Sequence, residues 1–150
     1  MVTESGWASG TFTAPGFTGT LTCLGMGLHP DSATFPNGYQ LLFTTGVDTG
    51  TDDAGTKTVT TAIQFNFAAA LAVRTYSNTD SDFCGSLTVQ FKGSSEFSAY
   101  GGTAAACSSG ATGTITLDVT DATAPHGTLT STLTDNDHPK TVSGMLQVTF

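Results

Sequence analysis

Oxygen-bearing side chains at alternate positions, Asn78, Asp80 and Asp82, could together bind a cation. Calcium loops begin in this way, because Ca²⁺ prefers carboxylate and amide oxygens as ligands. Such loops also need a turn glycine and a late bidentate acid, whereas Phe83 follows Asp82 directly and the next glutamate is Glu96. Calcium at these residues is therefore one hypothesis, and no other cofactor is predicted. The alternative is that acidic loops keep the protein soluble.

A second acidic motif, Asp48-Thr49-Gly50, resembles the motif that activates water in aspartic proteases. Those enzymes need two carboxylates that share one proton, because a close pair cannot ionise together and the split in pKa supplies both acid and base. This chain has one such motif, so a homodimer would have to supply the second. In those enzymes the motif follows a buried apolar strand, whereas Gly46 and Val47 precede it here. An aspartic-type hydrolase stays an alternative to a solvated hairpin loop, and no catalytic residue is assigned.

Aromatic residues suggest binding rather than catalysis. Most phenylalanines fall on the apolar side of alternating segments, whereas Tyr76 and Tyr100 are predicted to face outward and Trp7 lies near the terminus. Exposed rings can stack on sugars while neighbouring polar loops supply hydrogen bonds. These three residues are therefore the candidate ligand-binding residues, and a carbohydrate-binding module is one functional alternative.

The chain contains three cysteines, so a disulfide between any two of them leaves one thiol over. We predict a disulfide between Cys84 and Cys107, because Cys84 directly precedes a predicted strand and Cys107 lies in a turn of small residues that could fold back beside it. Cys23 ends an apolar strand face and is interpreted as a small buried hydrophobic residue.

Threonine and apolar residues alternate along most of the chain, and a period of two is typical of strands with one buried face. In the run 58–76 this alternation is longer than an ordinary strand. It indicates a bent strand or two strands joined by a bulge, with a short helix at 68–74 as the alternative. Eight to ten strands with turn signals between them predict a single all-β domain over residues 1–150. An antiparallel β-sandwich is favoured and a β-barrel is the alternative.

The threonine-rich faces also suggest a function. Thr114, Thr116 and Thr120 are predicted to lie opposite the outward residues of 128–134 in a hairpin. Regular hydroxyls on a sheet could order water, a pattern that resembles the ice-binding faces of β-rich antifreeze proteins. The ordinary interpretation is that threonine is a favoured residue at exposed strand positions.

Composition limits the partners. The chain carries 12 acidic against 4 basic residues, a net charge of −8 that repels nucleic acid and anionic membrane surfaces. Charged residues make up 11%, against roughly a quarter in ordinary domains, and no apolar run is long enough for membrane insertion. We therefore expect a non-catalytic, secreted or surface-exposed protein that acts in binding or assembly, with a protein or glycan surface as partner or by self-association. A virion structural protein, such as a decoration or tail protein, is the alternative.

Overall fold

The computed structural model describes residues 4–107, 112–136 and 143–150, and strands dominate these segments. The strands are β1 Glu4–Ala14, β2 Phe17–Pro30, β3 Tyr39–Asp52, β4 Gly55–Phe67, β5 Arg74–Ser77, β6 Phe83–Phe91, β7 Glu96–Gly101, β8 Thr114–Asp121, β9 His126–Asp135 and β10 Ser143–Thr149. The long run 58–76 is divided between β4 and β5, and residues 68–73 form an irregular connection with bends at 68–70 and 73 rather than the alternative helix. Among the described residues, no helix is long and apolar enough to cross a membrane.

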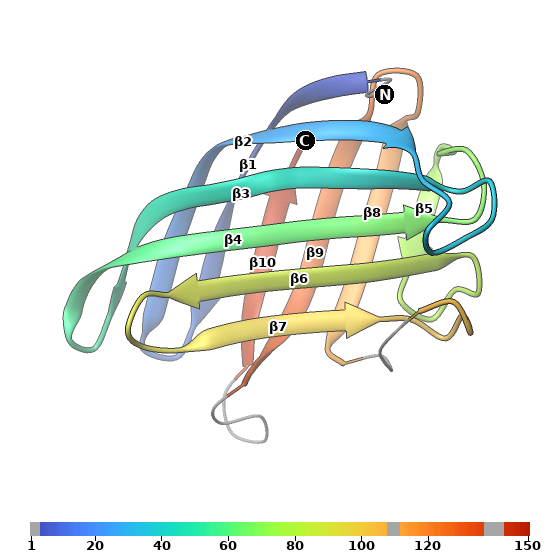
Figure 1. Cartoon of the computed structure of the whole chain (residues 1–150). Coiled ribbons are helices and arrows are strands. Elements are labelled where there is room, and N and C mark those ends of the chain that lie inside the picture. Colours follow the sequence, from blue (N-terminus) through green and yellow to red (C-terminus); the bar gives the residue numbers. More distant parts are fainter. Residues whose placement is uncertain (1–3, 108–111, 137–142) are drawn as a thin grey trace.

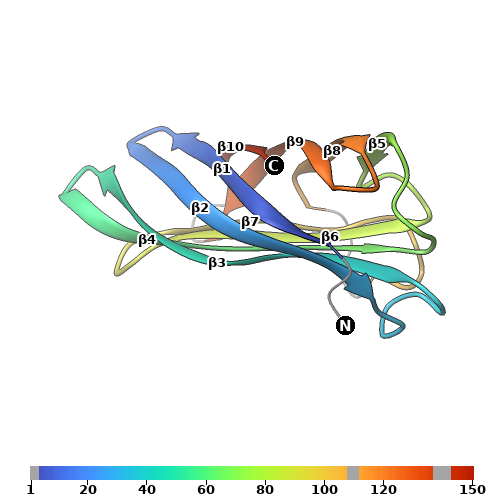
Figure 2. The same ribbon diagram turned by 90° about the horizontal axis from the view of Figure 1, so that it is seen from above.

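The ten strands form one antiparallel sheet in the order β10-β1-β2-β3-β4-β6-β7-β9-β8-β5. Because β10 also pairs with β9, the strands from β10 to β9 close into an eight-stranded barrel, and β8 and β5 extend the sheet beyond β9 (Figure 1). The all-β prediction is confirmed, and of the two predicted architectures the barrel is the one that forms. Seen from above, the barrel is flattened, with β3, β4, β6 and β7 facing β10, β9, β8 and β5 (Figure 2). The layers resemble a sandwich, but hydrogen-bonded strands join them at both sides.

Register shifts in three ladders break the simple alternation of inward and outward residues: β1–β2, β3–β4 and β8–β9. The β1–β2 ladder shifts between Ala8 and Gly10. As a result, Leu21 and Leu24 are both buried. In a regular strand, residues three positions apart would point to opposite faces. A bulge of this kind inserts one residue into a strand and turns its following side chains to the other face. Cys23, for which the sequence predicts burial, lies at this shift, and its side chain is outside the described part of the chain.

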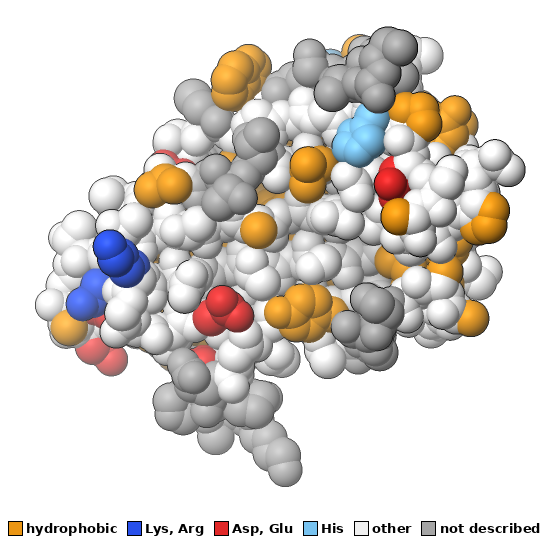
Figure 3. All heavy atoms as spheres, in the orientation of Figure 1, with side chains coloured by type: hydrophobic (Ala, Val, Ile, Leu, Met, Phe, Trp, Pro, Cys, Tyr) orange, Lys and Arg blue, Asp and Glu red, His pale blue; other side chains and the backbone are white. Residues whose placement is uncertain are grey.

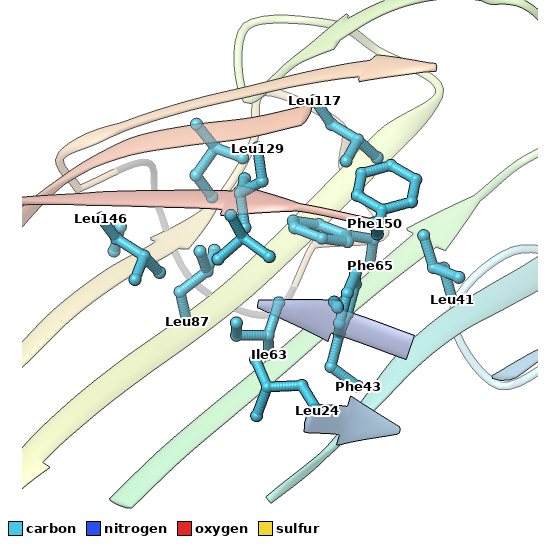
Figure 4. Packing of buried hydrophobic residues seen from close by; sticks show 14 of the residues in the cluster. Leu24, Leu41, Phe43, Ile63, Phe65, Leu87, Leu117, Leu129, Leu146 and Phe150 are labelled. Atoms are coloured by element: carbon cyan, nitrogen blue, oxygen red, sulfur yellow. The ribbon is translucent and has the colours of Figure 1, made fainter. Parts of the chain in front are cut away.

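One continuous cluster of apolar side chains fills the barrel. Ile63 of β4 and Leu87 of β6 point toward Leu129 of β9 and Leu146 of β10 (Figure 4). Several phenylalanine pairs pack edge to face along the interior, and Phe150 at the C-terminus joins them at 5.8 Å from the ring of Phe43. Since side chains occupy the interior, the outer wall of the barrel is the place for a functional site.

Candidate functional site

The most enclosed of the described surface hollows is a recess on the outside of β4, β6 and β7. Its volume is about 450 Å³, within the range of roughly 300–1,000 Å³ that is common for ligand sites. Strand residues form the floor, and two connecting segments form the walls. The residues that line it are Ala33, Thr34, Gln64, Asn66, Cys84, Gly85, Ser86, Tyr100, Gly101, Ala106 and Cys107.

Strand pairing brings the polar residues of the floor together. Gln64 of β4 is opposite Ser86 of β6, which is opposite Tyr100 of β7. Their neighbours Ile63 and Leu87 are buried in the barrel, so the alternation of the strands turns the three polar side chains outward. Neighbouring strands are about 4.8 Å apart. An amide, a hydroxyl and a phenol therefore form one row across the floor.

The disulfide forms one wall of the recess. Cys84 on β6 is bonded to Cys107, which confirms the predicted pairing. It anchors the segment that follows β7 against the sheet. Gly102 permits this close approach, because a Cβ at that position would lie 2.7 Å from the carbonyl oxygen of Phe83 and 3.1 Å from Sγ of Cys107.

The opposite wall is the β2–β3 connection, residues 31–38. It is tightened by two backbone hydrogen bonds, from Asp31 N to Gly38 O and from Gly38 N to Phe35 O. Asn37 supplies the left-handed conformation that the turn needs, with φ of 56°, and asparagine tolerates this region better than most residues. One wall is therefore covalently attached to floor strand β6, and the other is held by hydrogen bonds within its own turn.

The recess is polar but uncharged. Gln40 Nε2 donates to Asn66 Oδ1 at 3.3 Å, which orients the amide of Asn66, a residue that is only 7% exposed. No lysine, arginine, aspartate or glutamate is among the lining residues. On this face of the molecule the basic side chains gather at the end with the β3–β4 and β6–β7 hairpins (Figure 3). The site can therefore donate and accept hydrogen bonds and contact an apolar ring face, chemistry that suits a neutral, polar ligand.

The three predicted calcium ligands do not converge on one point. Asp80 and Asp82 both bind the guanidinium of Arg74, at 3.0 and 2.8 Å, and Asn78 instead bonds the backbone at Gly113 and Ile115. The hydrogen bond to Asp82 raises the pKa of Arg74 above its ordinary value, so this side chain stays charged. Arg74 thus occupies the position between the carboxylates that a cation would need. In the described part of the chain, His, Cys, Asp and Glu form no group of three or more that could hold a metal ion.

The three predicted ring platforms have different environments. Trp7 is 73% exposed on the outer face of β1, and Tyr100 is half-buried in the recess. The prediction that Tyr76 faces outward is wrong. This ring is 3% exposed because β5 turns it onto Phe67 and Phe83, where its hydroxyl accepts a hydrogen bond from Ala72 N. Tyr76 is therefore a core residue rather than a ligand platform.

Asp48, from the protease-like motif, has a structural role. The β2–β3 ladder is paired at Gly19–Gly50 and again at Met26–Phe43, and Asp48 lies in the interval between these pairs. Its carboxylate accepts hydrogen bonds from the backbone N–H and the hydroxyl of Thr22, at 3.1 and 2.9 Å. Asp48 thus joins the two strands between these two paired regions.

We expect Asp48→Ala to lower the free energy of unfolding by about 1–2 kcal/mol, because two hydrogen bonds to a partly exposed carboxylate are lost. Asp48→Asn should cost less, since an amide oxygen can still accept from the Thr22 N–H. Urea unfolding of both variants beside the wild type measures the difference. Equal stability of all three proteins would show that the contact to Thr22 contributes nothing.

No known protein family, curated protein or solved structure matches the chain. The geometry of the site is therefore the basis for a functional proposal.

Sequence reasoning found Tyr100 and the cysteine pair but did not connect them with Gln64, Asn66 and Ser86. The outward positions of Gln64 and Asn66 are visible in the alternation of β4. Their position beside Tyr100 depends on β6 pairing with both β4 and β7, which no local pattern reveals.

Proposed function

We propose that the protein is a non-catalytic binding protein and that the recess of β4, β6 and β7 binds a neutral carbohydrate. The observation that carries this proposal is the uncharged row of Gln64, Ser86 and Tyr100 between two walls. Sugars present hydroxyl groups that pair with amides and hydroxyls, and apolar ring faces that contact aromatic side chains. A net charge of −8 disfavours anionic ligands.

We also propose an extracellular or surface-exposed location. Disulfides persist mainly in oxidising compartments, and the bond between Cys84 and Cys107 fits such a setting. The low proportion of charged residues, 11%, is consistent with it. The alternative, a virion structural protein, predicts reduced cysteines, so the disulfide favours the first proposal.

The recess is tested by screening the wild type on an array of neutral glycans, followed by calorimetric titration with the best ligand. We expect Gln64→Ala and Tyr100→Ala each to weaken binding by about tenfold, the effect of roughly one lost hydrogen bond or ring contact. Gln90→Ala is the matched control, because Gln90 is exposed on β6 but outside the recess lining. Absence of binding to every neutral glycan, or equal weakening in the control, would contradict the proposal.

A further inference from the structure

A shallow groove of about 650 Å³ crosses the outer surface of β2, β1, β10 and β9. These strands lie side by side around the closing seam of the barrel (Figure 1). Strand pairing arranges the outward residues in rows. The first row consists of the successive neighbours Thr20, Thr11, Gln147 and Thr130. The next row consists of Ser9, Thr149 and Thr128.

The side chains of these rows are exposed and uncharged. Neighbours are about 4.8 Å apart across the strands and about 6.7 Å apart along them. Threonine is β-branched, so its χ1 angle is restricted and its hydroxyl is held in few positions. The groove therefore offers an array of ordered hydroxyls and one amide, at low cost in side-chain entropy when a ligand binds.

An aromatic residue lies in line with the groove. Trp7 precedes the groove residue Ser9 by two positions on β1, and Ala8 between them is buried, so both point to the outside. Trp7 is opposite Gly25 of β2, which has no side chain to cover the indole. At 73% exposure, this ring is open to a ligand on the outer face.

We propose that the groove and Trp7 form a second binding site, which takes an extended neutral oligosaccharide. One sugar ring stacks on Trp7 and the following units lie over the hydroxyl rows. The charge balance supports a neutral occupant, because the groove has no charged residue and the whole chain carries −8. A second copy of the chain carries the same net charge, which makes it a less favourable occupant than a neutral ligand.

The groove is distinct from the recess. By the shorter way round the closed barrel, through β10 and β9, Trp7 on β1 and Tyr100 on β7 are three strand intervals apart, or about 14 Å at a strand spacing of roughly 4.8 Å. One sugar ring cannot contact both residues. Two chains of an insoluble glycan could engage the two sites at once, and the linked contacts would bind more tightly than either site alone.

Trp7 is the single tryptophan of the chain, so its fluorescence reports on this site alone. The test is a titration of the wild type with cellohexaose, maltohexaose and chitohexaose. We expect a saturable change in tryptophan emission with at least one of them. Thr11→Ala combined with Thr130→Ala should weaken this binding about tenfold, since roughly two hydrogen bonds are lost.

Two control variants distinguish binding in the groove from binding elsewhere on the barrel. Thr58→Ala removes an exposed threonine of β4 outside the groove and should leave the titration unchanged. Gln64→Ala in the recess should also leave the titration of tryptophan emission unchanged. The proposals for the groove and for the recess can therefore be refuted independently. The proposal is overturned if no hexasaccharide changes the emission at millimolar concentration, or if Thr58→Ala weakens binding as much as the groove variant. It is also overturned if the protein lowers the freezing point of its solution and binds no sugar, because the hydroxyl rows would then order water rather than a glycan.

Discussion

Replacing Cys84 and Cys107 together with alanine is expected to lower the free energy of unfolding by about 3 kcal/mol. The bond joins residues separated by 23 positions, so it restricts the unfolded chain over a loop of that length. In the folded state it attaches the segment after β7 to β6. Chemical unfolding of the variant and the wild type under oxidising conditions measures the loss.

The same change should remove binding at the recess, because Cys84 and Cys107 belong to its wall. The wild type in reducing buffer is the control, and it should match the double variant in both stability and binding. Gln64→Ala separates the two effects, since it should weaken binding while stability stays near that of the wild type. If the double variant unfolds like the oxidised wild type, the disulfide does not stabilise the folded protein.

The alternation of residue types predicts most strands of this fold, because one face of each strand packs into the core. In β8, Ile115 and Leu117 are buried while Thr114 and Thr116 are exposed, as the pattern indicates. The prediction fails where pairing with a neighbour adds a residue. The burial of Leu24 after Leu21 depends on the shifted ladder between β1 and β2, a tertiary feature.

Closure of the barrel is equally hard to predict. A sandwich and a flattened barrel have the same inward and outward residues, and they differ only in which edge strands pair. Here β10 bonds both β1 and β9, which joins the two ends of the chain across the seam. The recess shows the same limitation, because its polar row is assembled from three strands whose order depends on long-range pairing.

The second large effect on stability is expected where β1 pairs with β10, at the seam between the first and the last strand. Gly10 lies opposite Val148, and the two backbones approach closely there. A Cβ at Gly10 would overlap the carbonyl oxygen of Gln147 and lie 2.9 Å from the Cα of Val148. Because backbone atoms of a paired strand cannot move aside individually, Gly10→Ala must push the two strands apart. We expect a loss of about 3 kcal/mol, at the upper end of typical overpacking costs.

Gly19→Ala is the matched control on the neighbouring strand β2. A Cβ there would lie 3.8 Å from the side chains of Phe91 and Val59, an ordinary contact. Since glycine within a strand is roughly 0.5–1 kcal/mol less favourable than alanine, this change should be neutral or slightly stabilising. Thermal unfolding and hydrogen exchange of the β1 and β10 amides compare the two variants. If Gly10→Ala keeps both the stability and the amide protection of the wild type, then the strands at the seam separate easily, and closure of the barrel contributes little to the stability of the fold.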